Sequence, residues 1–294
     1  PWIPGSRVMA ESEVADGRTC YVDLPVGTAL MAPSLLDPET GRVHPRVGHT
    51  RWYADQLRDA FADGSSREVV PRVREMQSCD EIVLLNCVDD LYGHGLLKLL
   101  NAQRHLEERP DLGLCVLVQP HLSHLVPEGV AEVWEVDIPA AEGVGWFESL
   151  ARWIRERLER YRVAWVSRAY SHLPPRYYDL QRFVGERERP TKLDGRRPVV
   201  GAHVRSDRLW GASTAHQERR LERLYHELRW RFPDSALAVM GFGERSHGAT
   251  DWPGWIDLRV DRPTRESEQG WLDVMAHSDL AFGVHGSNML LPTG

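Results

Sequence analysis

From residue 81 onward, short apolar runs of β-strand character alternate with amphipathic stretches of helical length. The first two runs are residues 81–87 and 112–118, and a stretch typical of a helix separates them. Continuous apolar runs bounded by polar residues are typical of strands that are buried on both faces of a parallel sheet. A strand, a helix and a strand in about 40 residues form a βαβ unit. The alternation therefore predicts an α/β fold built on parallel sheets.

This alternation occurs twice along the chain. The first series continues with strands near 131–138 and 163–166 and a helix over 145–161. The second has strands at 198–204, 235–241, 255–260 and 279–284 and helices at 215–232 and 268–277. The proline-rich stretch 171–198 between the two series has the composition of a linker. We therefore predict two tandem Rossmann-like domains, spanning 79–185 and 186–294, after an irregular N-terminal extension over 1–78.

The two ends of the chain are less regular. Residues 1–78 carry scattered turn signals around one expected helix at 51–61, and they indicate no function. The first residue is not Met, and residues 289–294 stop where an element begins. We expect the natural chain to continue beyond Gly294, so that the second domain is truncated here.

Charge and composition exclude several classes of protein. The net charge of −7 and the pI near 6.0 argue against a chain that grips a nucleic acid backbone. No stretch reaches the length of a membrane span, and the first residues lack a signal pattern. The four cysteines lie far apart, without disulfide or zinc spacing. We expect a cytoplasmic protein with no nucleic acid partner.

In open parallel sheets, ligands bind beyond the carboxyl ends of the strands. The first such place holds Asp89, Asp90 and His94, together with two glycines, in a turn that leads into a helix. These side chains are candidates for a general base. The alternative is that Asp89 or Asp90 only caps the helix. The turn does not match GxGxxG, so it gives little support to a dinucleotide site.

The second place follows the first strand of the second domain and holds His203, Arg205 and Asp207. An arginine at a strand end can clamp a phosphate with two hydrogen bonds, and its charge does not titrate near neutral pH. Arg205 is the best candidate for an anion ligand, and a surface ion pair with Asp207 is its alternative. His203 is either a catalytic residue or a core histidine.

The third place is the turn His285-Gly286-Ser287-Asn288, where small residues and a helix N-terminus favour a bound anion. A tight turn capped by Ser287 or Asn288 is the alternative. Gly241 and Gly243 form a further glycine-rich turn at a neighbouring strand end, with room for a nucleoside.

Two further histidines and several tryptophans are candidates for lesser roles. His121 and His124 are interpreted as solvated loop residues, with contact to an acceptor as the alternative. Among the tryptophans, Trp153 and Trp165 are expected in the core, whereas Trp210 and Trp252 are candidates for a ligand wall. There is no Walker A, GxSxG or HExxH sequence and no Asp-x-Asp of a metal-dependent transferase, so we expect no metal.

The order of these strands, helices and strand-end turns over residues 80–294 resembles that of a GT-B glycosyltransferase. Within it, residues 200–207 are similar to the HxRxxD-like motif at a strand end in the fucosyltransferase superfamily. Residues 279–288 look like the strand and HG(A/S)-type loop of the glycosyltransferase family with xylosyl- and O-GlcNAc-transferring members.

The resemblance implies transfer of a sugar from a nucleotide-sugar donor to a hydroxyl acceptor such as a saccharide. It places acceptor chemistry on the first domain and donor binding on the second. Asp89, Asp90 or His94 would deprotonate the acceptor, while Arg205 and residues 285–288 stabilise the leaving nucleoside diphosphate without a metal, and inversion is expected. The alternatives are an epimerase or hydrolase of sugar nucleotides and a non-catalytic sugar- or nucleotide-binding module.

Overall fold

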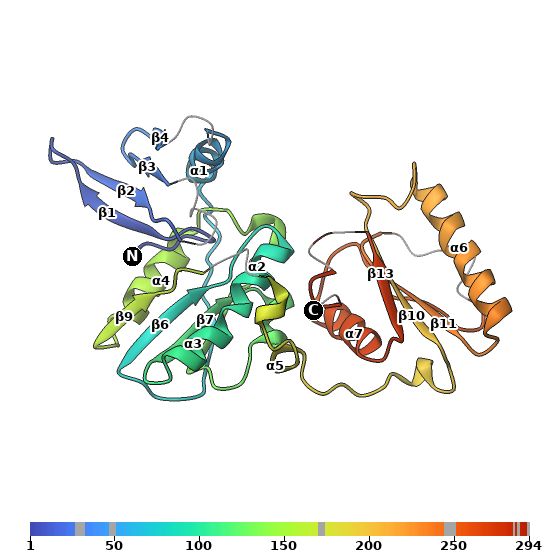
Figure 1. Ribbon diagram of the computed structural model, residues 1–294. Coiled ribbons are helices and arrows are strands. Elements are labelled where there is room, and N and C mark those ends of the chain that lie inside the picture. Colours follow the sequence, from blue (N-terminus) through green and yellow to red (C-terminus); the bar gives the residue numbers. More distant parts are fainter. Residues whose placement is uncertain are drawn as a thin grey trace. The chain divides into compact units, whose positions relative to one another are not determined.

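The computed structural model divides the chain into two compact units, unit 1 over residues 1–174 and unit 2 over residues 175–294. It describes residues 1–26, 33–46, 51–169, 174–243, 251–284, 286 and 289–292. Within these residues the fold is mixed α/β with three sheets, two of them in unit 1 and one in unit 2 (Figure 1).

The elements of each unit follow in chain order. The strands of unit 1 are β1 Met9–Glu13, β2 Thr19–Asp23, β3 Ser34–Leu36, β4 Val43–Pro45, β5 Arg72–Glu75, β6 Glu81–Asn86, β7 Gly113–Val118, β8 Glu132–Glu135 and β9 Val163–Val166. Its helices are α1 Arg51–Asp63, α2 Tyr92–Leu100, α3 Ala102–Glu108 and α4 Glu148–Leu158, with 3₁₀ turns at Pro120–Leu125 and Ala140–Glu142. Unit 2 contains β10 Val199–Val204, β11 Ala236–Gly241, β12 Trp255–Asp257 and β13 Leu280–Gly283, and its helices are α5 Gln181–Val184, α6 Thr214–Arg231 and α7 Arg265–Met275, with 3₁₀ turns at Pro175–Tyr177 and Thr191–Leu193.

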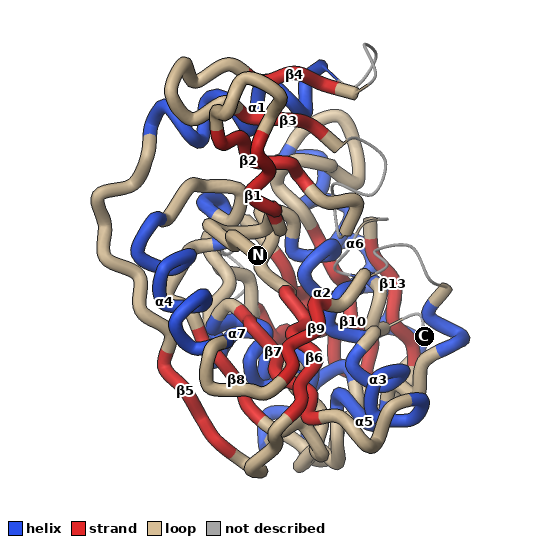
Figure 2. The backbone as a smooth tube through the Cα atoms, turned by 90° about the vertical axis from the view of Figure 1, so that its left-hand side faces the viewer, coloured by secondary structure: helices blue, strands red, loops and turns tan. Residues whose placement is uncertain are grey.

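The larger sheet of unit 1 has the strand order β5-β8-β7-β6-β9 (Figure 2). The four strands from β6 to β9 run parallel and confirm the strands expected from the apolar runs. Strand β5 adds to β8 in antiparallel orientation, so the sheet begins before residue 79. Strand β5 is not recognisable in the sequence, because its four residues, Arg-Val-Arg-Glu, form no apolar run.

Helices pack on both faces of this sheet. Leu150, Ile154 and Leu158 of α4 share one hydrophobic cluster with Ile82 and Leu84 of β6. Alternate side chains of a strand point to opposite faces, so the other residues of β6 face away from α4. On that side α2 lies against β6 and α3 against β7. The continuous apolar run of β6 is therefore explained by burial on both faces.

A buried carboxylate, Glu132, is satisfied within unit 1 rather than available for chemistry. Its oxygens accept hydrogen bonds from Arg157 (2.7 Å), from the Trp134 indole (2.7 Å) and from the Tyr161 hydroxyl (2.5 Å). Partners of this kind offset the cost of removing a charge from water. We therefore assign Glu132 a structural role.

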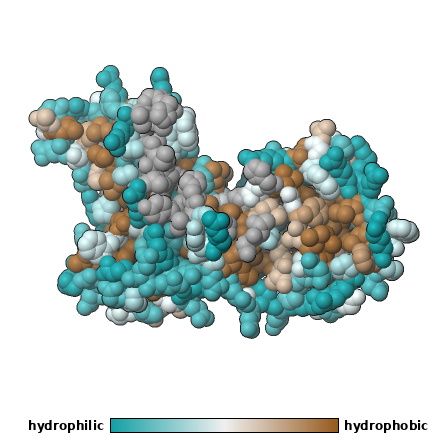
Figure 3. Space-filling view, in the orientation of Figure 1, coloured by the Kyte–Doolittle hydropathy of each residue, from teal (hydrophilic) through white to brown (hydrophobic). Residues whose placement is uncertain are grey.

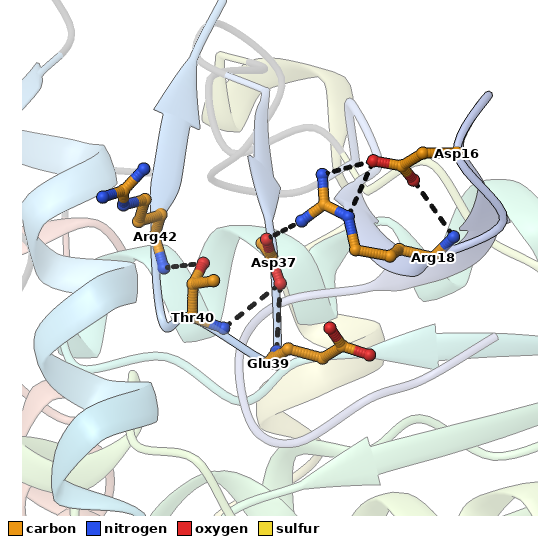
Figure 4. Close-up of polar contacts among 6 residues, drawn as sticks. All are labelled: Asp16, Arg18, Asp37, Glu39, Thr40 and Arg42. Atoms are coloured by element: carbon orange, nitrogen blue, oxygen red, sulfur yellow. Dashed lines mark hydrogen bonds and ion pairs between the residues drawn. The ribbon is translucent and has the colours of Figure 1, made fainter.

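The N-terminal segment forms a small antiparallel sheet, β1-β2-β3-β4, that the sequence analysis did not predict. Figure 4 shows how Asp37 organises the turn after β3: its Oδ1 accepts hydrogen bonds from the backbone N–H groups of Glu39 (3.0 Å) and Thr40 (3.2 Å). Arg18, beside β2, pairs with Asp37 and with Asp16. Local side-chain hydrogen bonds thus fix turns between strands that are too short to be recognised by their periodicity.

The first residues of the chain lie at the carboxyl end of β6. Asn86, the last residue of β6, donates its side-chain N–H to the carbonyl of Gly5 at 2.9 Å. The Ser6 N–H donates to the carbonyl of Gly143 (2.9 Å), and Phe147 donates to the carbonyl of Pro4 (2.9 Å). Residues 4–6 therefore help to build the surroundings of this strand end.

The sheet of unit 2 has the strand order β12-β11-β10-β13, and all its strands are parallel. Leu221 and Tyr225 of α6 pack with one set of strand residues, and Trp271 and Val274 of α7 pack with the alternate set. The two helices thus cover opposite faces. The outer surface along α6 is hydrophilic in Figure 3, as expected for a helix with three buried residues in five turns.

Candidate functional site

Each parallel sheet has one strand at which the order of connection reverses. Strand β6 is followed in the chain by β7 on one side and later by β9 on its other side, and β10 has the same relation to β11 and β13. In open α/β sheets, ligands bind beyond the carboxyl end of the strand at such a switch point. The candidate residues that follow β6 and β10 therefore occupy the favoured positions of their own sheets.

At the carboxyl end of β6, Asp89 forms a buried ion pair with Lys98 of α2. The Lys98 ammonium donates to Asp89 Oδ2 at 2.6 Å and to the carbonyl of Val88 at 2.9 Å. Both side chains are almost completely shielded from solvent. Burial opposes ionisation of Asp89, but the Lys98 charge and the hydrogen bonds from His94 and Lys98 outweigh it and hold its pKa below the ordinary value. Asp89 is thus a fixed negative charge.

The backbone of this turn is held as firmly as the side chain. The Asp89 N–H donates to the side-chain oxygen of Gln119 (3.2 Å), and Asp89 Oδ1 accepts from the N–H of Leu91 (3.1 Å). Leu91 is the N-cap of α2, and its own side chain makes no capping hydrogen bond. Asp89 thus holds the start of α2 and also pairs with Lys98, so capping is not its whole role.

His94 and Asp90 lie beside this buried charge. The Nδ1 atom of His94 is 3.3 Å from Asp89 Oδ1, and the imidazole side chain is 32% exposed. A buried carboxylate that orients an accessible imidazole is the arrangement of a general base with its orienting group. Burial, together with the hydrogen bond to Asp89 and its charge, raises the pKa of Asp90 to about 6. The structure thus brings together all three residues proposed as catalytic.

His121 lies in the 3₁₀ turn after β7 and corrects one expectation. Its side chain is buried, with its ring centroid 5.9 Å from that of Tyr92 at the start of α2. Burial lowers its pKa to about 4. The interpretation of His121 as a solvated loop residue is therefore wrong.

The sequence analysis missed two side chains that hold this site together, Lys98 and Gln119. Lys98 lies in the apolar stretch 95–100, and it is one of two lysines in the chain. A lone charge inside an apolar helical stretch indicates a buried partner of opposite sign, and the structure identifies that partner as Asp89. Gln119, which follows β7 directly and also donates to the carbonyl of Ile138 (3.0 Å), carries no comparable signal.

In unit 2, the register of the sheet places the ends of β11 and β13 beside the end of β10. His203 pairs with Gly283 of β13, and Val204 pairs with Gly241 of β11. The end of β10 is therefore flanked by the turns that follow β11 and β13. Gly286 lies in the second turn, and its carbonyl accepts a hydrogen bond from the N–H of Met289 (3.0 Å). His285, Ser287 and Asn288 lie outside the described residues.

Gly241 can only be glycine in this backbone. Its φ of +104° is a conformation that other residues rarely adopt, and a Cβ atom would lie 2.1 Å from the carbonyl oxygen of Val204. Gly243 has a φ of +144°, and a Cβ atom there would meet nothing within 4 Å. The turn after β11 is thus held close to β10 at its first glycine and is open at its second.

Arg205 and Asp207 form a two-point ion pair at the end of β10. Arg205 Nε donates to Asp207 Oδ1 at 2.7 Å, and a terminal guanidinium nitrogen donates to Oδ2 at 2.6 Å. The hydrogen bonds from Arg205 lower the pKa of Asp207, whose side chain is 58% exposed. The structure thus shows the surface pair that was the alternative for Arg205. The same fork geometry is the one by which a guanidinium holds a phosphate.

His203 is a buried residue of β10, 5.3 Å from the Trp271 ring in an edge-on arrangement. Burial, and to a smaller extent the charge of Arg205, lower the pKa of His203 to about 4. His203 is therefore neutral near pH 7.

A titration of stability should reveal the buried state of His203. Because its pKa is lowered on folding, the unfolded chain binds its proton first, and stability is lost as the pH falls from about 6.5 toward 4. We expect the His203→Gln variant to show a shallower loss over this interval, measured by urea unfolding at several pH values. The raised pKa of Asp90 increases the stability of the protein as the pH falls through this interval, which opposes the effect of His203. The variant and the wild type are therefore compared at each pH, so that the contribution of Asp90 cancels. Replacement of the exposed His226 by Gln should leave the wild-type slope. An unchanged slope in His203→Gln would contradict the assignment.

The tryptophans only partly follow expectation. Trp153 packs edge-on against Trp134, as expected for a core residue, but Trp165 on edge strand β9 is 55% exposed. The expectation that Trp165 lies in the core is therefore wrong. Trp210 and Trp252, the candidates for a ligand wall, are partly buried against the hydrophobic cluster of α6.

No group of three or more His, Cys, Asp or Glu side chains in the described ranges is placed to hold a metal ion. Among the helices described, none combines the length and the apolar character needed to cross a bilayer.

No family model, no curated protein and no solved structure matches this chain. Its function therefore has to be inferred from the two strand-end sites.

Proposed function

We propose that the protein is a glycosyltransferase that moves a sugar from a nucleotide-sugar donor to a hydroxyl acceptor, with two tandem Rossmann-like domains in a GT-B-like arrangement. The observation that carries the proposal is the buried Asp89–Lys98 ion pair, which lies beside the accessible His94 at the switch point of the sheet in unit 1. Besides holding Lys98 and the turn, Asp89 faces the imidazole of His94, and a fixed negative charge beside an imidazole assists proton abstraction by that imidazole.

In the proposed mechanism, His94 accepts the proton of the acceptor hydroxyl. Asp89 holds the imidazole and stabilises the imidazolium that forms. Asp90, with a pKa of about 6, is a second group able to take a proton near neutral pH. The acceptor oxygen then bonds to the anomeric carbon as the bond from that carbon to the diphosphate oxygen breaks. A single displacement of this kind inverts the configuration.

The leaving nucleoside diphosphate is proposed to bind at the carboxyl ends of β10 and β13. Arg205 exchanges its exposed partner Asp207 for a phosphate, because an exposed ion pair contributes little stability. The turn expected from the sequence at 285–288 is assigned to the same anion, and the open turn at Gly243 leaves room for the nucleoside. These groups take the place of a metal ion in stabilising the leaving group.

Ligand-induced stabilisation tests the donor site. A ligand that binds only the folded state raises the melting temperature. We expect one of UDP, GDP, CMP or dTDP to raise it equally with and without Mg²⁺, and Arg205→Ala to weaken that ligand by about 1.5–3 kcal/mol, the value of a charge-assisted hydrogen bond. The exposed Arg208→Ala serves as the matched control. If none of the nucleotides shifts the melting temperature, the donor site is wrong.

The base is tested by turnover with the nucleotide identified in this way. His94→Gln is expected to reduce kcat by about 10²- to 10⁴-fold, as for loss of a general base, while nucleotide binding stays unchanged. Release of nucleoside diphosphate only in the presence of an acceptor distinguishes a transferase from a hydrolase, an epimerase or a binding module. Full turnover in His94→Gln would exclude His94 as the base.

A further inference from the structure

A groove of about 760 Å³ lies in unit 1 between helix α1 and the segment 141–147. Its volume is within the range of small-molecule sites, roughly 300–1,000 Å³. The Ser65 N–H donates to the carbonyl of Trp146 at 3.0 Å, which ties the turn after α1 to the opposite wall. The groove is therefore built within one unit and does not depend on the other.

Its polar lining is strongly acidic. Asp55, Asp59 and Asp63 follow one another at every fourth position of α1, so they lie on one face, about 6 Å apart along the axis. Glu142 lines the opposite wall, and none of the groove's lining residues in the described chain is Lys, Arg or His.

Arginines outside the groove neutralise only part of this charge. The pairs are Arg51 with Asp55 (3.9 Å), Arg58 with Asp55 (2.6 Å) and Asp59 (2.8 Å), and Arg67 with Glu142 (3.0 Å). These arginines are 41% exposed or more, and such exposed pairs are weak. Within the described ranges no ion pair involves Asp63. The groove therefore favours a cationic ligand.

The groove also presents aromatic surface. Trp52 of α1 is 67% exposed, whereas Trp146 and Phe147 of the other wall are buried. A tryptophan that is two-thirds exposed forgoes much of the stabilisation of burial, and its flat face suits stacking against the apolar face of a sugar ring or against a cation. Carboxylates beside an exposed indole thus select a ligand that has both an ammonium group and an apolar face.

One wall of the groove also contacts the candidate base. Glu142 and Val144 line the groove, and Gly143 between them packs against the peptide that joins Asp89 to Asp90. A Cβ atom on Gly143 would lie 2.2 Å from the Asp89 carbonyl oxygen. The groove and the base site therefore share the segment 141–147.

We propose that this groove binds a saccharide that carries a protonated amine, with its ammonium groups on Asp59 and Asp63 and a ring stacked on Trp52. The binding of this amino saccharide in the groove is independent of the proposed transfer reaction. Its role as the acceptor rests on the transfer proposed above.

Titration calorimetry of the intact chain at about pH 6 tests the binding, with a disaccharide of glucosamine as the probe. Its di-N-acetylated form, which keeps the two sugar rings but carries no charge, is the neutral control, and spermidine is a cation without a sugar ring. We expect the affinity of the amino disaccharide to be at least about tenfold higher than that of the acetylated disaccharide or of spermidine. We also expect this affinity to fall as salt is added. Equal affinity for the acetylated form, equal affinity for spermidine, or no binding of the amino disaccharide would overturn the proposal.

Substitutions in the lining of the groove test whether the amino disaccharide binds there. Asp59→Asn combined with Asp63→Asn is expected to weaken the amino disaccharide about tenfold, and Trp52→Ala about fivefold. Glu156→Gln on the exposed face of α4 and Trp230→Ala, at a 76% exposed residue of unit 2, are the matched controls and should leave the affinity unchanged. Unchanged binding in both groove variants would also overturn the proposal.

Nucleotide stabilisation measured on the same samples separates this inference from the proposed function. If a nucleoside diphosphate stabilises the protein and the amino disaccharide does not bind, the groove assignment is wrong and the transferase stands. If the amino disaccharide binds and no nucleotide does, the groove assignment stands and the transferase is wrong.

Discussion

The Gly143→Ala variant is expected to lose about 3 kcal/mol of stability, the upper part of the range for overpacking, together with most of its turnover. The new Cβ atom would lie 2.2 Å from the carbonyl carbon and oxygen of Asp89 and 2.6 Å from the backbone nitrogen of Asp90. These are backbone atoms, which have no rotamer by which to move aside. The turn that positions the candidate base must therefore shift.

Backbone conformation does not contribute to this effect, because Gly143 has a φ of −57° and a ψ of −28°, which any residue adopts. Gly270→Ala in α7 is the matched control, since a Cβ atom there meets nothing within 4 Å. It should gain about 0.5–1 kcal/mol, as for alanine in a helix interior. Chemical unfolding and turnover measure both variants. Wild-type stability in Gly143→Ala would contradict the close approach of segment 141–147 to Asp89.

Separate replacement of either member of the buried Asp89–Lys98 pair is expected to cost about 3–5 kcal/mol of stability. Asp89→Leu leaves the Lys98 ammonium with the carbonyl of Val88 as its remaining hydrogen-bond partner among those described above, and Lys98→Met leaves a buried carboxylate. The double variant removes both charges, and we expect it to recover most of the loss. A double-mutant cycle by urea unfolding measures this coupling.

The pH dependence of the same variants provides a second readout. The pKa of Asp89 is lowered on folding, so its contribution to stability is present above its unfolded pKa, about 3.9, and is lost as the pH falls below that value. The double variant should lack this loss. It should also have reduced turnover, because His94 no longer has an orienting carboxylate. If the losses of stability in the two single variants simply add in the double variant, the buried Asp89–Lys98 ion pair is excluded.

The parallel strands β6 to β9 and β10 to β13 could be predicted from the sequence to within a few residues. The runs 81–87 and 198–204 became β6 and β10, because a strand buried on both faces requires apolar residues at consecutive positions. The long helix expected at 215–232 became α6, since the spacing of its apolar residues is a local signal. The choice of Asp89, Asp90 and His94 as neighbours followed from the position of a strand end.

Other features left little trace in the sequence. Strands β1 to β5 are short and partly exposed, so neither periodicity nor apolar character reveals them. Trp165 is exposed because β9 is an edge strand, and strand order is a property of the whole sheet. The partner chosen by Arg205 depends on the turn at residues 205–207, which the strand pattern does not specify.

The sequence of this chain defines where buried strands and amphipathic helices form, because these depend on the spacing of apolar residues over a few positions. Tertiary contacts bring Lys98 to Asp89, Gly143 to the peptide after Asp89, and α1 to the segment 141–147. These contacts join residues up to about 90 positions apart, and their energies depend on burial and on the distance between charges. Local sequence patterns encode neither quantity, which is why the candidate base could be located from the sequence, whereas its ion pair and the acidic groove could not.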